Sequence, residues 1–222
     1  MTSDPPQAAT APTALPEELP IFPIAGVLLL PRGRVPLNVS EPRDLAMVED
    51  ALGHGRLIGI IQPASSDDKT PVPVLYKVGC AGRITSFAET DDNHFLISLS
   101  GVCRFAVAEE LPQRHGYRRI RPDWRDYLND VGPVEDVDFD RARLMNVLRQ
   151  YFKTQGIATD WAAVQNASCE TLVSSLAVVC PFEPSEKQAL LEAPDLEARV
   201  KLLIALLEMA SLPQRETESA RH

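Results

Sequence analysis

Hydrophobic and polar positions follow two different periods along this chain. From about Leu19 to Trp124, apolar side chains tend to alternate with polar or small ones, which is the period of a half-buried β-strand. From about Val137 onward, apolar residues recur at every third or fourth position, which is the period of an amphipathic helix. A run of strands followed by a run of helices predicts an α+β fold.

A β-hairpin is the clearest element predicted in the first part. Apolar residues at every second position of residues 95–107 predict a strand that bends or breaks at Gly101. Residues 78–90 predict its partner. The intervening Asp91-Asp92-Asn93 is typical of a turn, so the two strands should pair as a hairpin.

A buried strand and a helix complete the first part. Residues 56–62 form a short apolar run that predicts a buried strand. Ser40-Glu41-Pro42 predicts a helix start, because proline is favoured at the first helical position. Gly53 or Gly55 should end this helix.

The second part should contain about four helices. Apolar faces cover residues 144–152 and residues 169–179, and Pro181 ends the second of them. Ser185 and Gln188 are spaced as a capping box and predict the start of a third helix. A leucine-rich helix follows from Leu196.

These patterns divide the chain into five segments. They are a disordered Pro/Ala-rich tail (1–17), a β-rich part (18–125), a linker (126–137), a helical bundle (138–212) and a frayed tail (213–222).

Charge and hydropathy narrow the classes of partner. The chain has 222 residues, 22 Lys+Arg against 31 Asp+Glu, and a net charge of −9. An acidic chain is poorly suited to nucleic acid or to an anionic membrane surface. No apolar run approaches the roughly 20 residues that cross a bilayer, and the first residues do not resemble a secretory signal. We therefore expect a cytoplasmic protein with no membrane contact.

Catalytic and metal-binding motifs are missing from the sequence. It contains no G-x-x-x-x-G-K-[ST] phosphate loop and no G-x-S-x-G nucleophile motif. The four cysteines include no C-x-x-C pair, and we expect them to be buried thiols. We therefore expect no cofactor, no metal and no catalytic residue, although a hydrolase site dispersed along the chain remains an alternative.

An arginine cluster at residues 114–125 has two readings. Arginines interleaved with His115, Tyr117 and Trp124 are typical of a single-stranded RNA platform. Alternatively, residues 116–122 form an edge or solvated strand whose arginines pair with nearby carboxylates. The acidic balance of the chain favours the second reading.

Five motifs in order resemble the amino-terminal domain of Lon proteases. They span about residues 18–212 and are Leu19-Pro20-Ile21-Phe22-Pro23-Ile24 with Pro36-Leu37, Ile58 to Gln62, Tyr76 to Ile84, Gly101 to Phe105, and Glu186 to Glu192 with Arg199. The chain departs from the family pattern at Asn38, where an aromatic residue is common, and at Ile24-Ala25-Gly26.

The resemblance implies a PUA-like twisted β pseudo-barrel followed by a C-terminal helical bundle. It also implies a peptidase S16-related, non-catalytic module that binds unfolded or tagged polypeptides, either alone or with a protease partner. In that family, separate domains hydrolyse ATP and cleave peptide bonds with a Ser–Lys site. We expect a stand-alone form that lacks both, and RNA binding by the arginine cluster or an uncharacterised hydrolase activity remains an alternative function. A small-molecule site between barrel and bundle is a further alternative.

The expected substrate-binding residues lie in one segment. They are Leu28, Leu30, Arg32, Arg34 and Asn38, where an apolar patch rimmed by cations would suit an unfolded chain. The alternative for Leu28 and Leu30 is that they fill the barrel interior.

Overall fold

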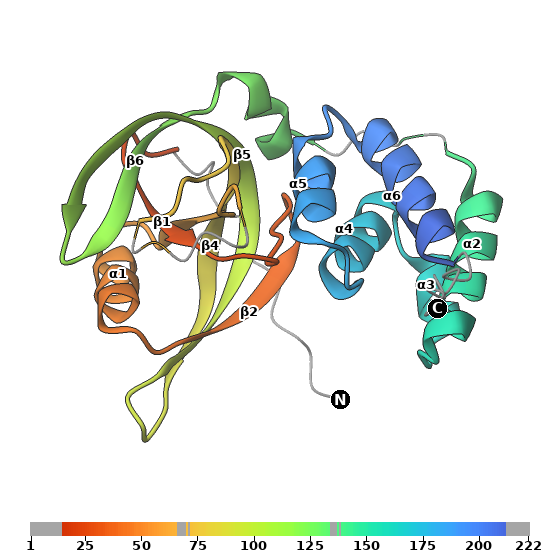
Figure 1. Cartoon of the computed structure of the whole chain (residues 1–222), viewed down its shortest axis with the longest axis horizontal. Coiled ribbons are helices and arrows are strands. Elements are labelled where there is room, and N and C mark those ends of the chain that lie inside the picture. The colour runs from red at the N-terminus through yellow and green to blue at the C-terminus, as the bar shows by residue number, and fades with distance from the viewer. Residues whose placement is uncertain (1–14, 66–69, 71, 134–136, 138, 212–222) are drawn as a thin grey trace, which may run out of the picture.

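A β-barrel and a helical bundle lie side by side in the computed structural model (Figure 1). The structure describes residues 15–65, 70, 72–133, 137 and 139–211. The predicted tails at 1–17 and 213–222 therefore lie largely outside the described residues. The arrangement confirms the predicted α+β class, with strands in the first part and helices in the second.

The strands and helices of the first part extend from residue 19 to residue 131. They are β1 (Leu19–Pro23), β2 (Arg34–Val39), α1 (Pro42–Gly53), β3 (Leu57–Ile61), β4 (Val78–Glu89), β5 (Phe95–Arg114), β6 (Tyr117–Asp123) and the 3-10 helix η1 (Arg125–Val131). Pro42 begins α1 and Gly53 ends it, as the sequence predicted.

The sheet closes on itself. Its order is β2-β5-β4-β3-β1-β6, and β6 also pairs with β5, so five strands form a ring and β2 lies outside it. The pair β1–β3 is parallel and the others are antiparallel. Because β6 pairs with β1 on one side and β5 on the other, the expectation that residues 116–122 form an edge strand is wrong.

The longest strand serves two parts of the sheet. The first half of β5 pairs with β2 and β4, while its second half pairs with β6. No break occurs at Gly101, but a register shift beside it bulges the ladder. A Cβ at Gly101 would lie 1.9 Å from the Leu30 carbonyl oxygen, so glycine is required for the close approach of residues 30 and 31.

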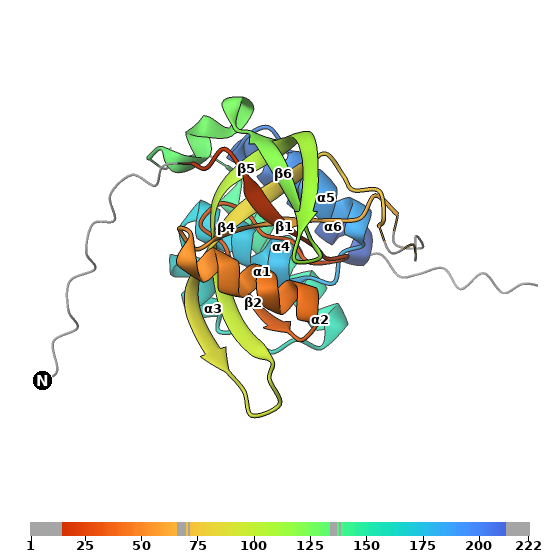
Figure 2. The same ribbon diagram turned by 90° about the vertical axis from the view of Figure 1, so that its left-hand side faces the viewer.

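The predicted β4–β5 hairpin is confirmed, and its end extends beyond the barrel as an arm (Figure 2). Asn93 in the turn has φ +59, in the left-handed region that Asn tolerates. The Thr90 amide donates to the His94 carbonyl over 2.9 Å, which closes the turn. On the other side of the barrel from the bundle, α1 crosses the barrel opening (Figures 1 and 2).

The second part contains five helices within the described residues, one more than expected. They are α2 (Arg141–Gln155), α3 (Trp161–Asn166), α4 (Cys169–Val179), α5 (Pro184–Glu192) and α6 (Leu196–Ser211). The helix missed in the sequence, α3, is too short to show a period. Its first turn is held by the Asp160 carboxylate, which accepts bonds from two backbone amides.

The predicted cap of α5 is wrong. The helix begins at Pro184, and the Glu186 carboxylate accepts from the Glu183 amide over 2.8 Å. Gln188, the expected cap residue, is buried against the barrel instead. It donates to the Val78 carbonyl over 3.0 Å and accepts from Gln62 over 3.1 Å.

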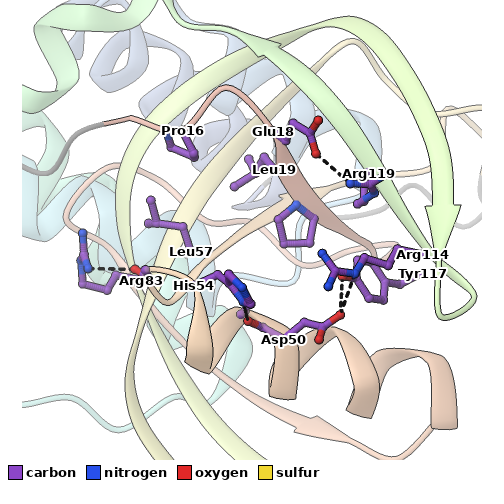
Figure 3. A pocket seen from close by; sticks show the side chains of 13 residues that line it. Pro16, Glu18, Leu19, Asp50, His54, Leu57, Arg83, Arg114, Tyr117 and Arg119 are labelled. Carbon is purple, nitrogen blue, oxygen red and sulfur yellow. Dashed lines mark hydrogen bonds and ion pairs between the residues drawn. The ribbon is translucent and has the colours of Figure 1, made fainter.

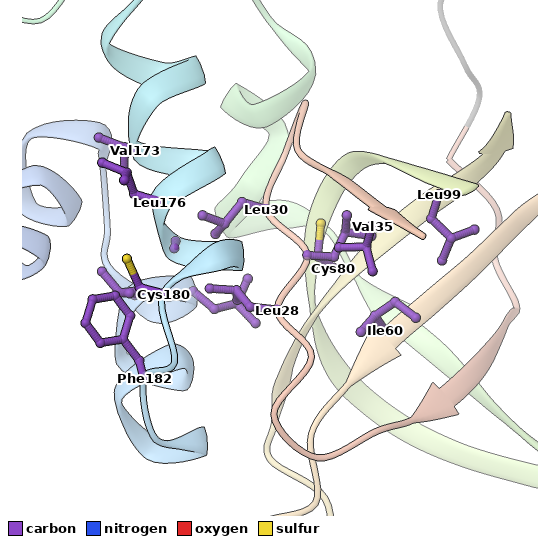
Figure 4. Close-up of a cluster of buried hydrophobic side chains, with 14 of the residues drawn as sticks. Leu28, Leu30, Val35, Ile60, Cys80, Leu99, Val173, Leu176, Cys180 and Phe182 are labelled. Atoms are coloured by element: carbon purple, nitrogen blue, oxygen red, sulfur yellow. The ribbon is translucent and has the colours of Figure 1, made fainter. Parts of the chain in front are cut away.

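Barrel and bundle share one apolar core. Leu28 and Leu30 lie between Val173, Leu176, Cys180 and Phe182 of the bundle and Val35, Ile60, Cys80 and Leu99 of the barrel (Figure 4). Polar contacts reinforce this junction. The Lys187 ammonium donates to the Gly26 carbonyl over 2.8 Å, and burial lowers the pKa of Lys187.

A buried arginine also joins the two parts. Arg104 on β5 forms a two-bond ion pair with Asp130 of η1, with both N–O distances 2.9 Å. It also donates to the carbonyls of Leu191 and Ala193 at the end of α5, over 3.2 and 2.6 Å. These carbonyls would otherwise be unsatisfied helix-end acceptors. Arg104 therefore orients the bundle against η1 and the barrel.

Candidate functional site

The structure divides the expected substrate-binding segment between interior and surface. Leu28 and Leu30 are buried, but they lie between barrel and bundle and not in the barrel interior that the alternative expected. Their segment is not a strand but an irregular stretch between two apolar bodies, so both side chains are covered. Neither side chain faces solvent, so neither can contact a substrate at the surface of this structure.

Arg32 is engaged in contacts between the two parts. It has φ +60, and its guanidinium donates to Glu170 of α4 over 2.6 Å and to the Gly132 carbonyl over 2.5 Å. This arginine therefore ties the turn before β2 to the bundle.

Arg34 and Asn38 are exposed on the outer face of β2. Residues of a strand alternate between faces, so Arg34, Pro36 and Asn38 share that face while Val35 and Val39 point inward. Arg34 forms no ion pair or hydrogen bond with the described residues. It is therefore a free cation on this face.

A shallow hollow of about 470 Å³ lies where β2 pairs with the arm of the β4–β5 hairpin. It is lined by residues 36–38, 86–88 and 96–98, and the paired residues Leu37, Ile97 and Phe87 lie in its central row. Side chains of the flanking rows border the hollow. We call this flanking set the arm face: Pro36, Asn38, Ser86, Ala88, Leu96 and Ser98.

The arm face is uncharged, with three apolar residues (Pro36, Ala88, Leu96) and three polar ones (Asn38, Ser86, Ser98). Leu96 is 47% exposed at its centre, between the small side chains of Ala88 and Ser98. Sequence reasoning missed Leu96, yet a signal was present. Leu96 occupies a polar phase of the alternation formed by Phe95, Ile97 and Leu99, so it had to point outward.

A second hollow of about 450 Å³ separates β2 from α4. We call it the β2–α4 groove; its lining residues are Arg32, Gly33, Arg34, Glu170, Thr171, Ser174, Ser175, Val178 and Val179. Within the described residues β2 pairs only with β5, so its other edge is unpaired. Arg34 borders the groove, and Pro36 and Asn38 on the same strand border the arm face. The two surfaces are therefore continuous along β2.

A third cavity of about 550 Å³ lies at the barrel opening beside α1 (Figure 3). Asp50 is its most connected side chain. It accepts from the Tyr117 hydroxyl over 2.7 Å and contacts His115 Nδ1 at 3.0 Å. The Tyr117 bond lowers the pKa of Asp50. Burial and the same bond raise the pKa of Tyr117 to about 12.

The arginine cluster is paired with carboxylates. Its ion pairs are Arg114–Asp50, Arg118–Glu110, Arg119–Glu18, Arg121–Glu109 and Arg125–Asp123. The expectation that these arginines pair with nearby acids is confirmed. Because their charges are compensated, the cluster does not form the cationic surface that an RNA platform needs.

The thiols of this protein are poorly suited to nucleophilic chemistry. All four cysteines are buried, and none forms a disulfide. Burial raises the pKa of Cys103 to about 12 and that of Cys180 to about 11, which disfavours the nucleophilic thiolate. Among the residues that the structure describes, no group of three or more His, Cys, Asp or Glu could hold a metal ion. None of the helices found there has the length and apolar character to cross a membrane.

Comparison with solved structures supports the fold. A Lon N-terminal domain protein from Xanthomonas campestris superposes with a TM-score of 0.61 at 23% identity, covering 85% of this chain and 97% of that one. The N-terminal domain of a Lon protease from the Mycobacterium avium complex superposes with a TM-score of 0.54 at 13% identity, covering 86% and 98%.

Curated relatives are full Lon proteases. Lon protease 2 of Sorangium cellulosum is 28% identical over 93% of this chain and 26% of its own length. Lon protease 2 of Myxococcus xanthus is 27% identical over 87% and 24%. The chain thus spans about a quarter of the length of these relatives. The family described as the ATP-dependent protease La (LON) substrate-binding domain matches residues 18–209. This chain belongs to the Lon substrate-binding domain family.

Proposed function

We propose that this protein is a non-catalytic module that binds unfolded or tagged polypeptide through the arm face and the β2–α4 groove. Membership of a substrate-binding family supports the class of ligand. The observation that carries the choice of surface is the exposed Leu96 on an uncharged face beside an unpaired strand edge. Folded proteins usually protect such edges, and exposed apolar surface next to one suits an extended chain.

An extended segment would lie along the free edge of β2. Its backbone would pair with the unpaired edge of β2 on either side of Pro36, which has no N–H to donate, and this pairing provides affinity without a required sequence. Its alternate side chains would contact the small and apolar residues of the arm face. This mode fits clients that share an unfolded state but no motif.

Arg34 would bias the choice of segment. It is the free cation where the arm face meets the groove, and the groove wall opposite carries Ser175, Val178 and Val179. A segment with an acidic residue near an apolar one would complement this pair of features. Segments rich in lysine would bind less well.

The groove lacks the parts of a hydrolytic site. Ser174 and Ser175 line it, but no His or Lys is among its lining residues to activate either hydroxyl. Glu170 is committed to Arg32. We therefore propose binding without bond cleavage at this surface.

The test compares two leucines of similar exposure. Leu96 is 47% exposed on the arm face, and Leu128 is 52% exposed on η1, away from it. We expect Leu96→Asp to weaken binding of a reduced, carboxymethylated model protein by about tenfold, as for loss of one apolar anchor. Leu128→Asp should bind like the unmodified protein. Fluorescence anisotropy with the labelled model protein measures both.

Two results would contradict the proposal. One is an equal effect of both substitutions, and the other is no saturable binding by the unmodified protein at high micromolar concentration. Far-ultraviolet circular dichroism and thermal unfolding of both variants show whether the fold is retained.

A further inference from the structure

We infer that the cavity at the barrel opening is a separate binding site for an apolar group that carries a carboxylate. This chemistry occurs at the C-terminal residue of a polypeptide and in small free carboxylic acids. In Figure 1, α1, which borders this cavity, lies on the opposite side of the barrel from α4, which borders the β2–α4 groove, so this inference does not depend on the proposed function.

The interior of the cavity is apolar. Leu19, Ala51, Leu57 and Tyr117 are buried and contribute to its lining, with the ring of Pro20 beside them. Its volume of about 550 Å³ is within the range of small-ligand sites. An apolar side chain of ordinary size would fit there without rearranging the barrel.

Guanidinium groups surround this apolar interior. Arg83, Arg114 and Arg119 come from three different strands, β4, β5 and β6. Figure 3 shows Arg83 on one side of the cavity and the other two on the opposite side. Two acids, Glu18 and Asp50, also line it, so these side chains carry one excess positive charge.

Two of the three arginines are held by the protein. Arg119 pairs with Glu18 at 2.7 Å and donates two bonds to the Pro112 carbonyl. Arg83 donates to the Gly55 carbonyl over 3.0 Å. Both therefore contribute positive electrostatic potential at the rim of the cavity, but part of their hydrogen-bonding capacity is already used within the protein.

Arg114 is the group suited to bind an anion. Its side chain is 48% exposed, and its ionic partner is Asp50 at a long 3.5 Å. Within the described residues its guanidinium donates no hydrogen bond. Asp50 already receives the Tyr117 hydroxyl and contacts His115, so it retains partners if Arg114 turns toward a ligand.

The charge balance selects a carboxylate. A guanidinium matches a carboxylate with two parallel bonds. The one excess positive charge balances a singly charged carboxylate, whereas a doubly charged phosphate would leave one negative charge uncompensated beside Glu18 and Asp50. The apolar interior then favours a carboxylate with an attached aliphatic side chain.

The test uses a matched pair of hexapeptides that end in leucine, one with a free carboxylate and one with a C-terminal amide. Two-dimensional NMR of the full chain follows the backbone amides of Leu19, Leu57 and Tyr117. We expect the free acid to shift these amides and to bind about tenfold more tightly than the amide, as for one charge-assisted hydrogen-bonded pair. N-acetyl-leucine distinguishes the sources: similar affinity indicates a small acid, and much weaker binding indicates a polypeptide C-terminus.

Arg114→Gln is the variant, and Arg121→Gln is its matched control. Arg121 is a similarly exposed arginine of the same hairpin, paired with Glu109 outside the cavity. We expect Arg114→Gln to abolish the preference for the acid and Arg121→Gln to retain it. Equal binding of acid and amide, or an equal response of the two variants, would overturn the inference. Leu96→Asp should leave acid binding unchanged, so failure here is separable from failure of the proposed function.

Discussion

Residues 28–38 run through two different environments. Leu28 and Leu30 are enclosed between barrel and bundle, whereas Arg34 and Asn38, a few residues later, lie on an open strand face. Both stretches mix apolar side chains with arginine, so local composition does not distinguish them. What distinguishes them is a second apolar body, the bundle, which covers the first stretch and leaves the second free. The first half contributes to the apolar core, and the second half is exposed to solvent.

The largest expected effect tests the covered region. Arg104→Ala should lower the free energy of unfolding by about 3–5 kcal/mol, because it leaves Asp130 without its buried partner and two α5 carbonyls without a donor. Chemical denaturation measures it. Arg121→Ala, at an exposed ion pair, should cost less than about 1 kcal/mol and is the control. A loss under about 1 kcal/mol for Arg104→Ala would show that this junction does not hold the two parts together.

A smaller effect separates stability from binding. Leu30→Ala should cost about 2–5 kcal/mol through the cavity that it creates between barrel and bundle. Affinity of the folded fraction for the unfolded model protein should stay within about twofold, because Leu30 is buried outside the proposed binding surface. Denaturation and anisotropy at the same temperature give both values. A tenfold loss of affinity with little loss of stability would show that Leu30 contacts the substrate. The buried and the exposed stretch of residues 28–38 would then not differ in role.

The smallest expected effect tests the exposed stretch, residues 34–38. Arg34→Glu should leave the free energy of unfolding within about 0.5 kcal/mol, since Arg34 has no partner to lose. It should shift the preference between acidic and basic unfolded peptides by a few fold, toward the basic one. Competition anisotropy at low and high salt measures the preference, which should weaken at high salt. An unchanged preference would place the substrate away from this residue.

Periodicity and turn chemistry predicted most elements of this fold. The β4–β5 hairpin, α1 and the helical second part follow from local signals, since side-chain alternation and proline at a helix start act within a few residues. Closure of the ring could not be predicted in this way. It depends on β6 reaching both β1 and β5, which are distant in sequence and carry no local mark of being partners.

The candidate sites were less predictable. Arg34 and Asn38 were expected on the surface, and Leu96 carried a detectable out-of-phase signal. The cavity at the barrel opening is assembled from β1, α1, β3, β4, β5 and β6, so no contiguous motif marks it. The capping residue of α5 was missed because Gln188 is used between helix and barrel, a tertiary role that overrides its local preference.

The pairing of Leu19 with Ile120 has a consequence for how the polypeptide is made. A ribosome must synthesise some hundred residues after β1 before the last partner of that strand exists. Until then the nascent ring is open, with apolar edges exposed to chaperones and proteases. Such distant pairing also slows folding, because a long loop must close before the contact is gained. A domain that is proposed to bind unfolded chains is therefore itself incompletely folded until β6 has been synthesised.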